Sequence, residues 1–221
     1  MEPKIKGKAF NYNDTRDRKF YDVFVWMFHP LAKIVFKTQY IGRENVPKTG
    51  SLIIASNHRN SYDPGLIAAA RVRKIHYMAK LELFNLNKLA SWMLRHLNAF
   101  PISRGTGDQR SLNYAIRLVE EGKVLGIFPE GTRSKDGEIH RFKAGAFTLA
   151  KEAGAEILPV VLDGTKTLIK KNLAFNWGNR ITIRVLPPVS AGRVAAAETH
   201  ELMQEVHDAM CAALAEIRNK K

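Results

Sequence analysis

Short apolar runs alternate along the chain with stretches of helical periodicity. The runs are bounded by charged residues, glycine or proline, a pattern typical of buried strands. We predict strands at 51–56, 74–79, 98–103, 123–128, 156–162 and 180–186. We predict helices at 64–72, 84–97, 108–121, 144–153 and about 196–218. Such alternation favours parallel pairing, so the pattern predicts an α/β fold in a single domain, with a mainly parallel sheet covered by helices.

Residues 20–38 are the most apolar part of the chain. On a helical wheel their charged and histidine positions share one narrow side: Asp22, His29, Lys33 and Lys37. Pro30 is expected to break or kink the segment into two pieces, which predicts an N-terminal amphipathic helix pair rather than an uninterrupted membrane span. With Trp26 as an anchor, the pair is expected to lie in the headgroup region of a membrane. Packing of the same helices on the core is the alternative.

These patterns divide the chain into three parts. Residues 1–15 are expected to form a mobile basic arm, residues 16–40 an amphipathic membrane-association segment, and residues 41–221 the α/β domain. The first ten residues are charged and have no adjoining apolar region, which is not typical of a signal peptide.

The charge balance indicates anionic partners. The 221 residues contain 35 lysines and arginines but 21 acidic residues, a formal net charge of +14. Such a surface suits anionic lipid headgroups, phosphorylated substrates, an acidic carrier protein or nucleic acid. No basic run is interleaved with aromatic residues and no nucleic-acid motif is present, so nucleic acid is not expected. The single cysteine, Cys211, excludes an intrachain disulfide and suits a reducing compartment.

A first candidate site lies in NHRNSYDP at 57–64. His58 and Asp63 are five positions apart, roughly 140° around a helix, so direct contact between them requires a loop. The sequence provides one, because a predicted strand precedes the motif and Pro64 fits the first position of a helix, with Asp63 as its N-cap. In the alternative reading, Asp63 only caps the helix and His58 is an ordinary polar residue.

A second candidate site is FPEGTRS at 128–134, directly after a predicted strand. The planar guanidinium of Arg133 suits a phosphate, and Gly131 permits a positive φ or close backbone approach. Glu130 would repel a phosphate, so we expect it to bond a substrate hydroxyl or to order Arg133. A surface salt bridge is the alternative for Arg133, and also for Arg104 in the segment 100–105.

Both strings resemble motifs of the glycerolipid acyltransferases, the lysophosphatidate acyltransferase superfamily. The first matches the family's NHxxxxD motif and the second its third motif. Three further segments resemble family motifs in the family's order: YMAKLELF at 77–84, FPISRG at 100–105 and ILPVVLDG at 157–164. Ser103 replaces an acid found in many members, which leaves the choice of acceptor open.

The resemblance implies transfer of a fatty acyl group from acyl-carrier protein or coenzyme A to 1-acyl-sn-glycerol 3-phosphate, giving phosphatidic acid. It implies no metal and no cofactor beyond the thioester donor, and a peripheral or monotopic position on the cytoplasmic face of the cell membrane. His58 would act as the general base and Asp63 would orient it. The substrate-binding candidates are Lys80, Arg104, Glu130, Gly131, Thr132, Arg133 and Pro159.

The chain has no Gly-x-Ser-x-Gly elbow, and Cys211 lies far from every motif, so we expect the hydroxyl to attack the thioester directly. Two alternatives remain. One is a sister acyltransferase that uses glycerol 3-phosphate or another lysolipid. The other is a non-catalytic basic protein that binds membrane or nucleic acid, against which the intact pair of His58 and Asp63 argues.

Overall fold

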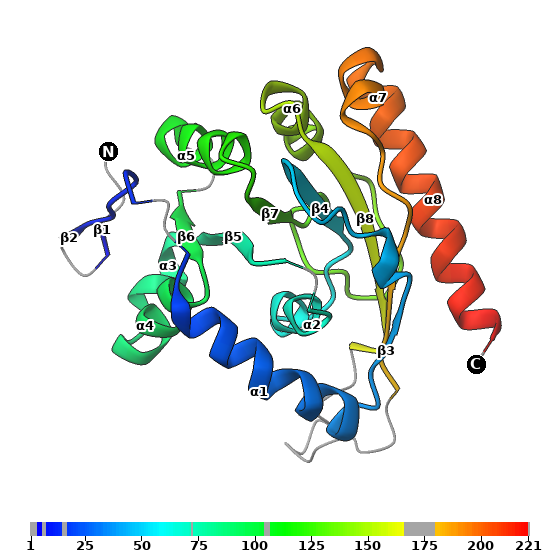
Figure 1. Cartoon of the computed structure of the whole chain (residues 1–221), viewed down its shortest axis with the longest axis horizontal. Helices are drawn as coiled ribbons and strands as arrows, with labels where there is room; N and C mark the ends of the chain where they lie inside the picture. The colour runs from blue at the N-terminus through cyan, green and yellow to red at the C-terminus, as the bar shows by residue number, and fades with distance from the viewer. Residues whose placement is uncertain are drawn as a thin grey trace.

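The computed structural model describes residues 4–5, 8–14, 17–71, 73–103, 107–165 and 180–220. Its centre is a seven-stranded sheet of order β3-β9-β8-β4-β7-β5-β6 (Figure 1). The strands are β3 (Gln39–Ile41), β4 (Leu52–Ser56), β5 (Ile75–Lys80), β6 (Ala99–Ile102), β7 (Val124–Ile127), β8 (Glu156–Asp163) and β9 (Thr182–Val185). All six predicted strands are confirmed, whereas β3 is too short to give a periodic signal.

The sheet is mostly parallel, as predicted. Strand β4 pairs in parallel with both β7 and β8, β5 pairs in parallel with β7 and β6, and β3 with β9. The pairing of β8 with β9 is antiparallel. The carboxyl ends of β4, β5, β7 and β8 therefore meet at one edge of the sheet, where α/β folds place their ligand sites.

Helices cover both faces of the sheet (Figure 1). On one face α1 (Lys19–Val35) and α2 (Asp63–Ala69) bury Ala32, Leu66 and Ile67 against the strands. The other face carries α5 (Gln109–Glu120), α6 (Gly145–Glu152), α7 (Ala191–Ala196) and α8 (Thr199–Asn219). There Leu118, Phe147 and Leu202 are fully buried. A short 3-10 helix, η1 (Arg43–Asn45), follows β3.

The connection between β5 and β6 contains two helices where one was predicted. Helix α3 (Leu81–Asn85) ends before α4 (Lys88–His96) begins. The side chain of Asn87 accepts a hydrogen bond from the backbone N–H of Ala90 at 2.7 Å and so caps α4. Asparagine favours this cap over a helix interior, which explains the break.

Helix α1 is continuous through Pro30, so the predicted helix pair is wrong. Contacts on both sides of the proline hold the helix. The Nδ1 atom of His29 lies 2.6 Å from the carbonyl oxygen of Ala69, and the hydroxyl of Thr38 donates to the carbonyl of Ala32 at 2.8 Å. Pro30 itself is exposed on the outer side of the helix. Among the described residues, no helix has the length and apolar character to cross a membrane.

The described part of the N-terminal segment contacts the domain, where the sequence had predicted a mobile arm. Strands β1 (Lys4–Ile5) and β2 (Lys8–Ala9) pair as a small hairpin. The hydroxyl of Tyr12 donates to the carbonyl of Pro101 at 3.1 Å and lies 3.0 Å from the hydroxyl of Ser111. Local composition could not reveal these contacts, because their partners are about ninety positions away or more.

Candidate active site

The loop between β4 and α2 brings His58 and Asp63 together. One oxygen of Asp63, Oδ2, accepts hydrogen bonds from Nδ1 of His58 at 2.9 Å and from the backbone N–H groups of Arg59 at 2.6 Å and Asn60 at 2.7 Å. Asp63 is fully buried. The expectation that Asp63 is the N-cap is wrong, because Tyr62 occupies that position and Asp63 begins the helix. Its carboxylate faces back toward the loop and holds the histidine.

The imidazole of His58 is fixed by stacking as well as by Asp63. Its ring lies 4.0 Å from the ring of Phe128, centroid to centroid and nearly parallel, and the ring of Tyr77 stacks with Phe128 at 5.9 Å. Gly126 makes room for this stack, since a Cβ there would lie 2.2 Å from the Tyr77 ring. The His58 side chain keeps 20% of its surface exposed. The bond to Nδ1 leaves Nε2 as the nitrogen that can exchange a proton with a substrate.

Glu130 joins the two motifs. Its Oε1 accepts the backbone N–H of His58 at 3.0 Å, and its Oε2 accepts the backbone N–H of His140 at 3.2 Å. The backbone N–H of Ser134 in turn donates to the carbonyl of His58 at 2.7 Å. Burial raises the pKa of Glu130, and the two backbone bonds partly oppose that rise. The sequence suggested Arg133 or a substrate hydroxyl as the partner, whereas within the described residues this carboxylate binds main chain.

Three further candidates lie in the loop after β7. Arg133 is exposed, and its Nη1 donates to the hydroxyl of Ser61 at 2.8 Å, which places the guanidinium beside the first motif. Gly131 adopts φ +71°, as its predicted role requires, and a Cβ there would lie 3.1 Å from Nζ of Lys143. Thr132 is exposed between them. The loop thus presents two cations near one glycine.

The other candidates are more scattered. Lys80 is exposed at the carboxyl end of β5, a neighbour of β7 in the sheet. Pro159 is buried within β8 opposite Ala55, inside the sheet rather than at its edge. Arg104 lies outside the described residues. Before it, the backbone N–H of Ser103 donates to the carboxylate of Asp108 at 3.0 Å.

Sequence reasoning missed a buried ion pair beside His58 and Asp63, the two residues that we call the dyad. Nη1 of Arg59 donates to Asp163 at 2.6 Å, and the two side chains are 8% and 9% exposed. Gly137, at φ +95°, passes so close that a Cβ would lie 2.2 Å from Nη2 of Arg59. Arg218 lies 3.7 Å from Asp163 and also binds Glu138 at 2.7 Å, which connects α8 to this cluster. Arg59 and Asp163 do fall within the first and fourth motif segments, which was the available signal.

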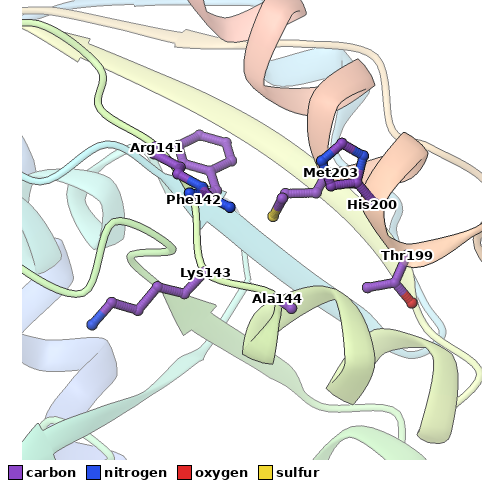
Figure 2. Close-up of a pocket in the computed structure, with 7 residues that line it drawn as sticks. All are labelled: Arg141, Phe142, Lys143, Ala144, Thr199, His200 and Met203. Carbon is purple, nitrogen blue, oxygen red and sulfur yellow. The ribbon is translucent and has the colours of Figure 1, made fainter.

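An open cavity of about 530 Å³ lies between α6 and the beginning of α8 (Figure 2). Its lining consists of Arg141, Phe142, Lys143, Ala144, Thr199, His200 and Met203. The backbone N–H of Lys143 donates to the carbonyl of Pro129 at 2.9 Å, so the cavity adjoins the loop of the third motif but does not contain the dyad. Within the part of the chain that the structure describes, no group of three or more histidine, cysteine or acidic side chains could hold a metal ion.

The class of protein follows from the fold and the site together. A histidine held by a buried carboxylate lies at the carboxyl edge of a mostly parallel sheet, where α/β folds place their ligand sites. A family model described as "Acyltransferase" matches residues 37–163, the span that contains both motifs. The chain belongs to this acyltransferase family and is an enzyme that transfers acyl groups.

Known members share sequence and fold with it. A 1-acyl-sn-glycerol-3-phosphate acyltransferase of Bacillus subtilis is 30% identical over 182 residues, which is 80% of this chain and 86% of the relative. One from Borreliella burgdorferi is 30% identical over 168 residues, 76% of this chain and 67% of the relative. The crystal structure of the 1-acyl-sn-glycerophosphate (LPA) acyltransferase PlsC from Thermotoga maritima matches with a TM-score of 0.72 and 27% identity, over 90% of this chain and 79% of that one.

Proposed function

We propose that the protein transfers a fatty acyl group from an acyl-ACP or acyl-CoA thioester to the free hydroxyl of 1-acyl-sn-glycerol 3-phosphate, giving phosphatidic acid. The names of the relatives from B. subtilis and B. burgdorferi support this acceptor. The observation that carries the proposal is the 2.9 Å bond between Nδ1 of His58 and Asp63, because it makes Nε2 available as a base.

Each step of the proposed reaction has a residue to perform it. A hydroxyl is a poor nucleophile at neutral pH, so Nε2 of His58 removes its proton as the oxygen attacks the thioester carbon. The carbon–sulfur bond then breaks, and the proton passes from His58 to the departing sulfur. Asp63 holds the ring in the required tautomer and stabilises the imidazolium between these steps.

Cations near the dyad would bind the acceptor phosphate. Arg133 presents a planar guanidinium beside the first motif, and Lys80 is exposed at the end of β5. We include Arg104 in the same proposal only because it lies in FPISRG at 100–105, the segment that resembles a family motif. Gly131 and Thr132 lie in the loop that carries Arg133, where backbone can approach the ligand closely. Pro159 is proposed only to shape the wall behind the acyl or thioester group.

The proposal includes peripheral attachment to the cytoplasmic face of a membrane. Helix α1 exposes large apolar side chains, of which Trp26 is 70% and Ile34 is 77% exposed. Exposed groups of this size suit the boundary between headgroups and acyl chains. Residues 16–40 are therefore kept as the membrane-association segment.

A panel of acceptors tests the proposed function. Purified protein should acylate 1-acyl-sn-glycerol 3-phosphate faster than its unphosphorylated analogue, glycerol 3-phosphate or other lysolipids. The variant Arg133→Ala should raise the KM for the phosphorylated acceptor by about tenfold to hundredfold, the cost of one charge-assisted contact. Lys48→Ala, another exposed cation, is the control. Faster transfer to a different lysolipid would favour the sister activity, which the serine at position 103 leaves open.

A further inference from the structure

Helix α4 shows the reverse of the usual burial pattern of a surface helix, because its apolar side chains are exposed and a polar one is buried. Its apolar side chains Leu89, Trp92 and Met93 are 67%, 40% and 38% exposed. Their spacing places them on one side of the helix. The polar residue Ser91, which lies between them in sequence, is only 2% exposed. The helix thus turns its apolar side outward and a hydroxyl inward.

The preceding segment continues this surface. Leu83 in α3 is 41% exposed, and Leu86, between the two helices, is 67% exposed. Ten of the twelve exposed large hydrophobic residues in the described chain lie either here or on α1: Val23, Trp26, Met27, Leu31, Ile34, Leu83, Leu86, Leu89, Trp92 and Met93. We call these ten side chains the α1–α4 face. Such clustering differs from the scattered apolar residues of an ordinary surface.

The two halves of the α1–α4 face adjoin. The rings of Phe20 in α1 and Trp92 in α4 are 4.8 Å apart, edge to face, and Phe20 also contacts the ring of His96 at 6.0 Å. In Figure 1 the beginning of α1 lies next to α4. The surface therefore extends from α1 across to α3 and α4.

Charges around the α1–α4 face have one predominant sign. In 19–37 and 81–96 together, five cationic residues occur against two acidic ones: Lys19, Lys33, Lys37, Lys88 and Arg95 against Asp22 and Glu82. One of the acids, Asp22, is paired with Lys74 at 2.8 Å. A surface that combines exposed apolar side chains with an excess of cationic residues is complementary to an anionic bilayer, where acyl chains lie beneath negative headgroups.

We infer that residues 81–96 form a second membrane-binding element, and that the α1–α4 face binds an anionic lipid bilayer as one surface. The inference rests on the proposed function and extends it, since that proposal placed membrane contact in residues 16–40. Helix α3 begins directly after Lys80, at the strand edge that carries the candidate site. Binding through α3 and α4 would hold that edge at the lipid surface, where a lysolipid acceptor resides.

Vesicle binding of the full-length protein tests the inference. The double variant Leu86→Ser/Leu89→Ser removes two exposed leucines without touching the core. It should lower partitioning onto vesicles of phosphatidylcholine and phosphatidylglycerol at least about tenfold, given the gain from burying two leucines in an apolar phase. Ile41→Ser is the matched control, because Ile41 is 39% exposed and lies outside the α1–α4 face. Transfer between short-chain, water-soluble substrates should be unchanged in both variants.

Direct contact can be measured through Trp92. The variant Trp26→Phe/Trp177→Phe leaves Trp92 as the remaining one of three tryptophans. Brominated phosphatidylcholine in the same vesicles should quench its fluorescence, and adding Leu86→Ser/Leu89→Ser should relieve the quenching. Unchanged partitioning of the leucine variant, or a Trp92 that brominated lipid does not quench, would overturn the inference.

A second copy of the chain is the competing occupant of the α1–α4 face. A wild-type dimer that Leu86→Ser/Leu89→Ser converts to a monomer, with vesicle binding preserved, would show that the face binds a second copy. Vesicle binding can be measured even if no acceptor in the panel is acylated. Failure of the proposed membrane contact is therefore distinguishable from failure of the proposed acyl transfer.

Discussion

The carboxylate of Glu130 accepts the backbone N–H of His58 at 3.0 Å, although the two residues are 72 positions apart. Its second oxygen accepts the backbone N–H of His140 at 3.2 Å. The acid of the third motif thus fixes the main chain of the candidate base, while Asp63 fixes its ring. The two motifs form one unit, and the acid belongs to its framework.

Glu130→Ala should therefore reduce kcat rather than acceptor binding. The substitution removes the acceptor of two partly buried backbone N–H groups, at about 1–3 kcal/mol each, and lets the His58 loop shift. We expect kcat to fall on the order of tenfold to hundredfold, because small displacements of a base are costly, with the acceptor KM within about twofold. Glu130→Gln should recover part of the loss, since one oxygen acceptor remains. Steady-state kinetics and melting temperatures check this.

The exposed acid Glu138 on the same loop is the control for Glu130. It binds Arg218 at 2.7 Å, and Glu138→Ala should change kcat much less. A rise in acceptor KM with kcat unchanged would instead make Glu130 a substrate ligand, as the sequence first suggested.

The two members of the dyad should differ in their effects. His58→Ala removes the proposed base and should reduce kcat by about a hundredfold to ten-thousandfold, while the acceptor still binds. Asp63→Asn should lose less, because the amide oxygen can still accept the donors now on Oδ2, although the histidine tautomer is less well fixed. Turnover and acceptor binding by calorimetry separate these effects. Near-normal turnover by folded His58→Ala would disprove the mechanism.

The fold was predictable because its signals are local. Buried strands such as 51–56 are short apolar runs, and the parallel arrangement follows from their alternation with helices. The two failures have different causes, one tertiary and one local. Pro30 indicated a break that tertiary contacts override, and Asn87 supplied a cap that an apolar pattern over 84–97 concealed.

The candidate site was predictable in part. The contact of His58 with Asp63 followed from loop geometry and motif spacing, and the structure contains it. The partners of Glu130 and the pairing of Arg59 with Asp163 depend on contacts across 72 and 104 positions. No local pattern encodes such contacts, because the sheet order that creates them is itself a long-range property.

The ion pair of Arg59 and Asp163 should matter for stability. Because the side chains are 8% and 9% exposed, Asp163→Ala would leave a buried guanidinium without this carboxylate, at a cost of about 3–5 kcal/mol in the free energy of unfolding. Replacing both charges, as Arg59→Met/Asp163→Leu, should cost less than Asp163→Ala alone. Chemical denaturation measures both. Equal or greater destabilisation by the double variant would show that the charge left behind is not the main penalty.

His76 should make the fold sensitive to acid. Burial lowers the pKa of His76 to about 4, although Asp17 at 3.4 Å favours the protonated ring. Between about pH 6.5 and pH 4 the unfolded chain binds a proton at this site that the folded chain does not, so stability is lost as the pH falls through this range. We expect a contribution of about 1–3 kcal/mol to the free energy of unfolding. His76→Asn should remove this component, and His200→Asn, an exposed histidine, should keep it. Identical pH profiles for both variants would contradict the assignment.

The kinetic order should reflect a direct attack on the thioester. Cys211 is the one cysteine of the chain, and its sulfur lies 3.7 Å from Nε2 of His207, one turn away on α8. A histidine this close to a cysteine is typical of an activated thiol. Burial, together with the negative charge of Asp208, raises the pKa of Cys211, however, so the thiol stays protonated. Cys211→Ala should therefore retain close to full activity.

Initial rates against both substrates should give intersecting lines, because acceptor and thioester must occupy the site together. After incubation with the donor alone, mass spectrometry should find the protein unacylated. Parallel lines with a stable acyl adduct would identify an overlooked nucleophile and exclude direct attack by the hydroxyl.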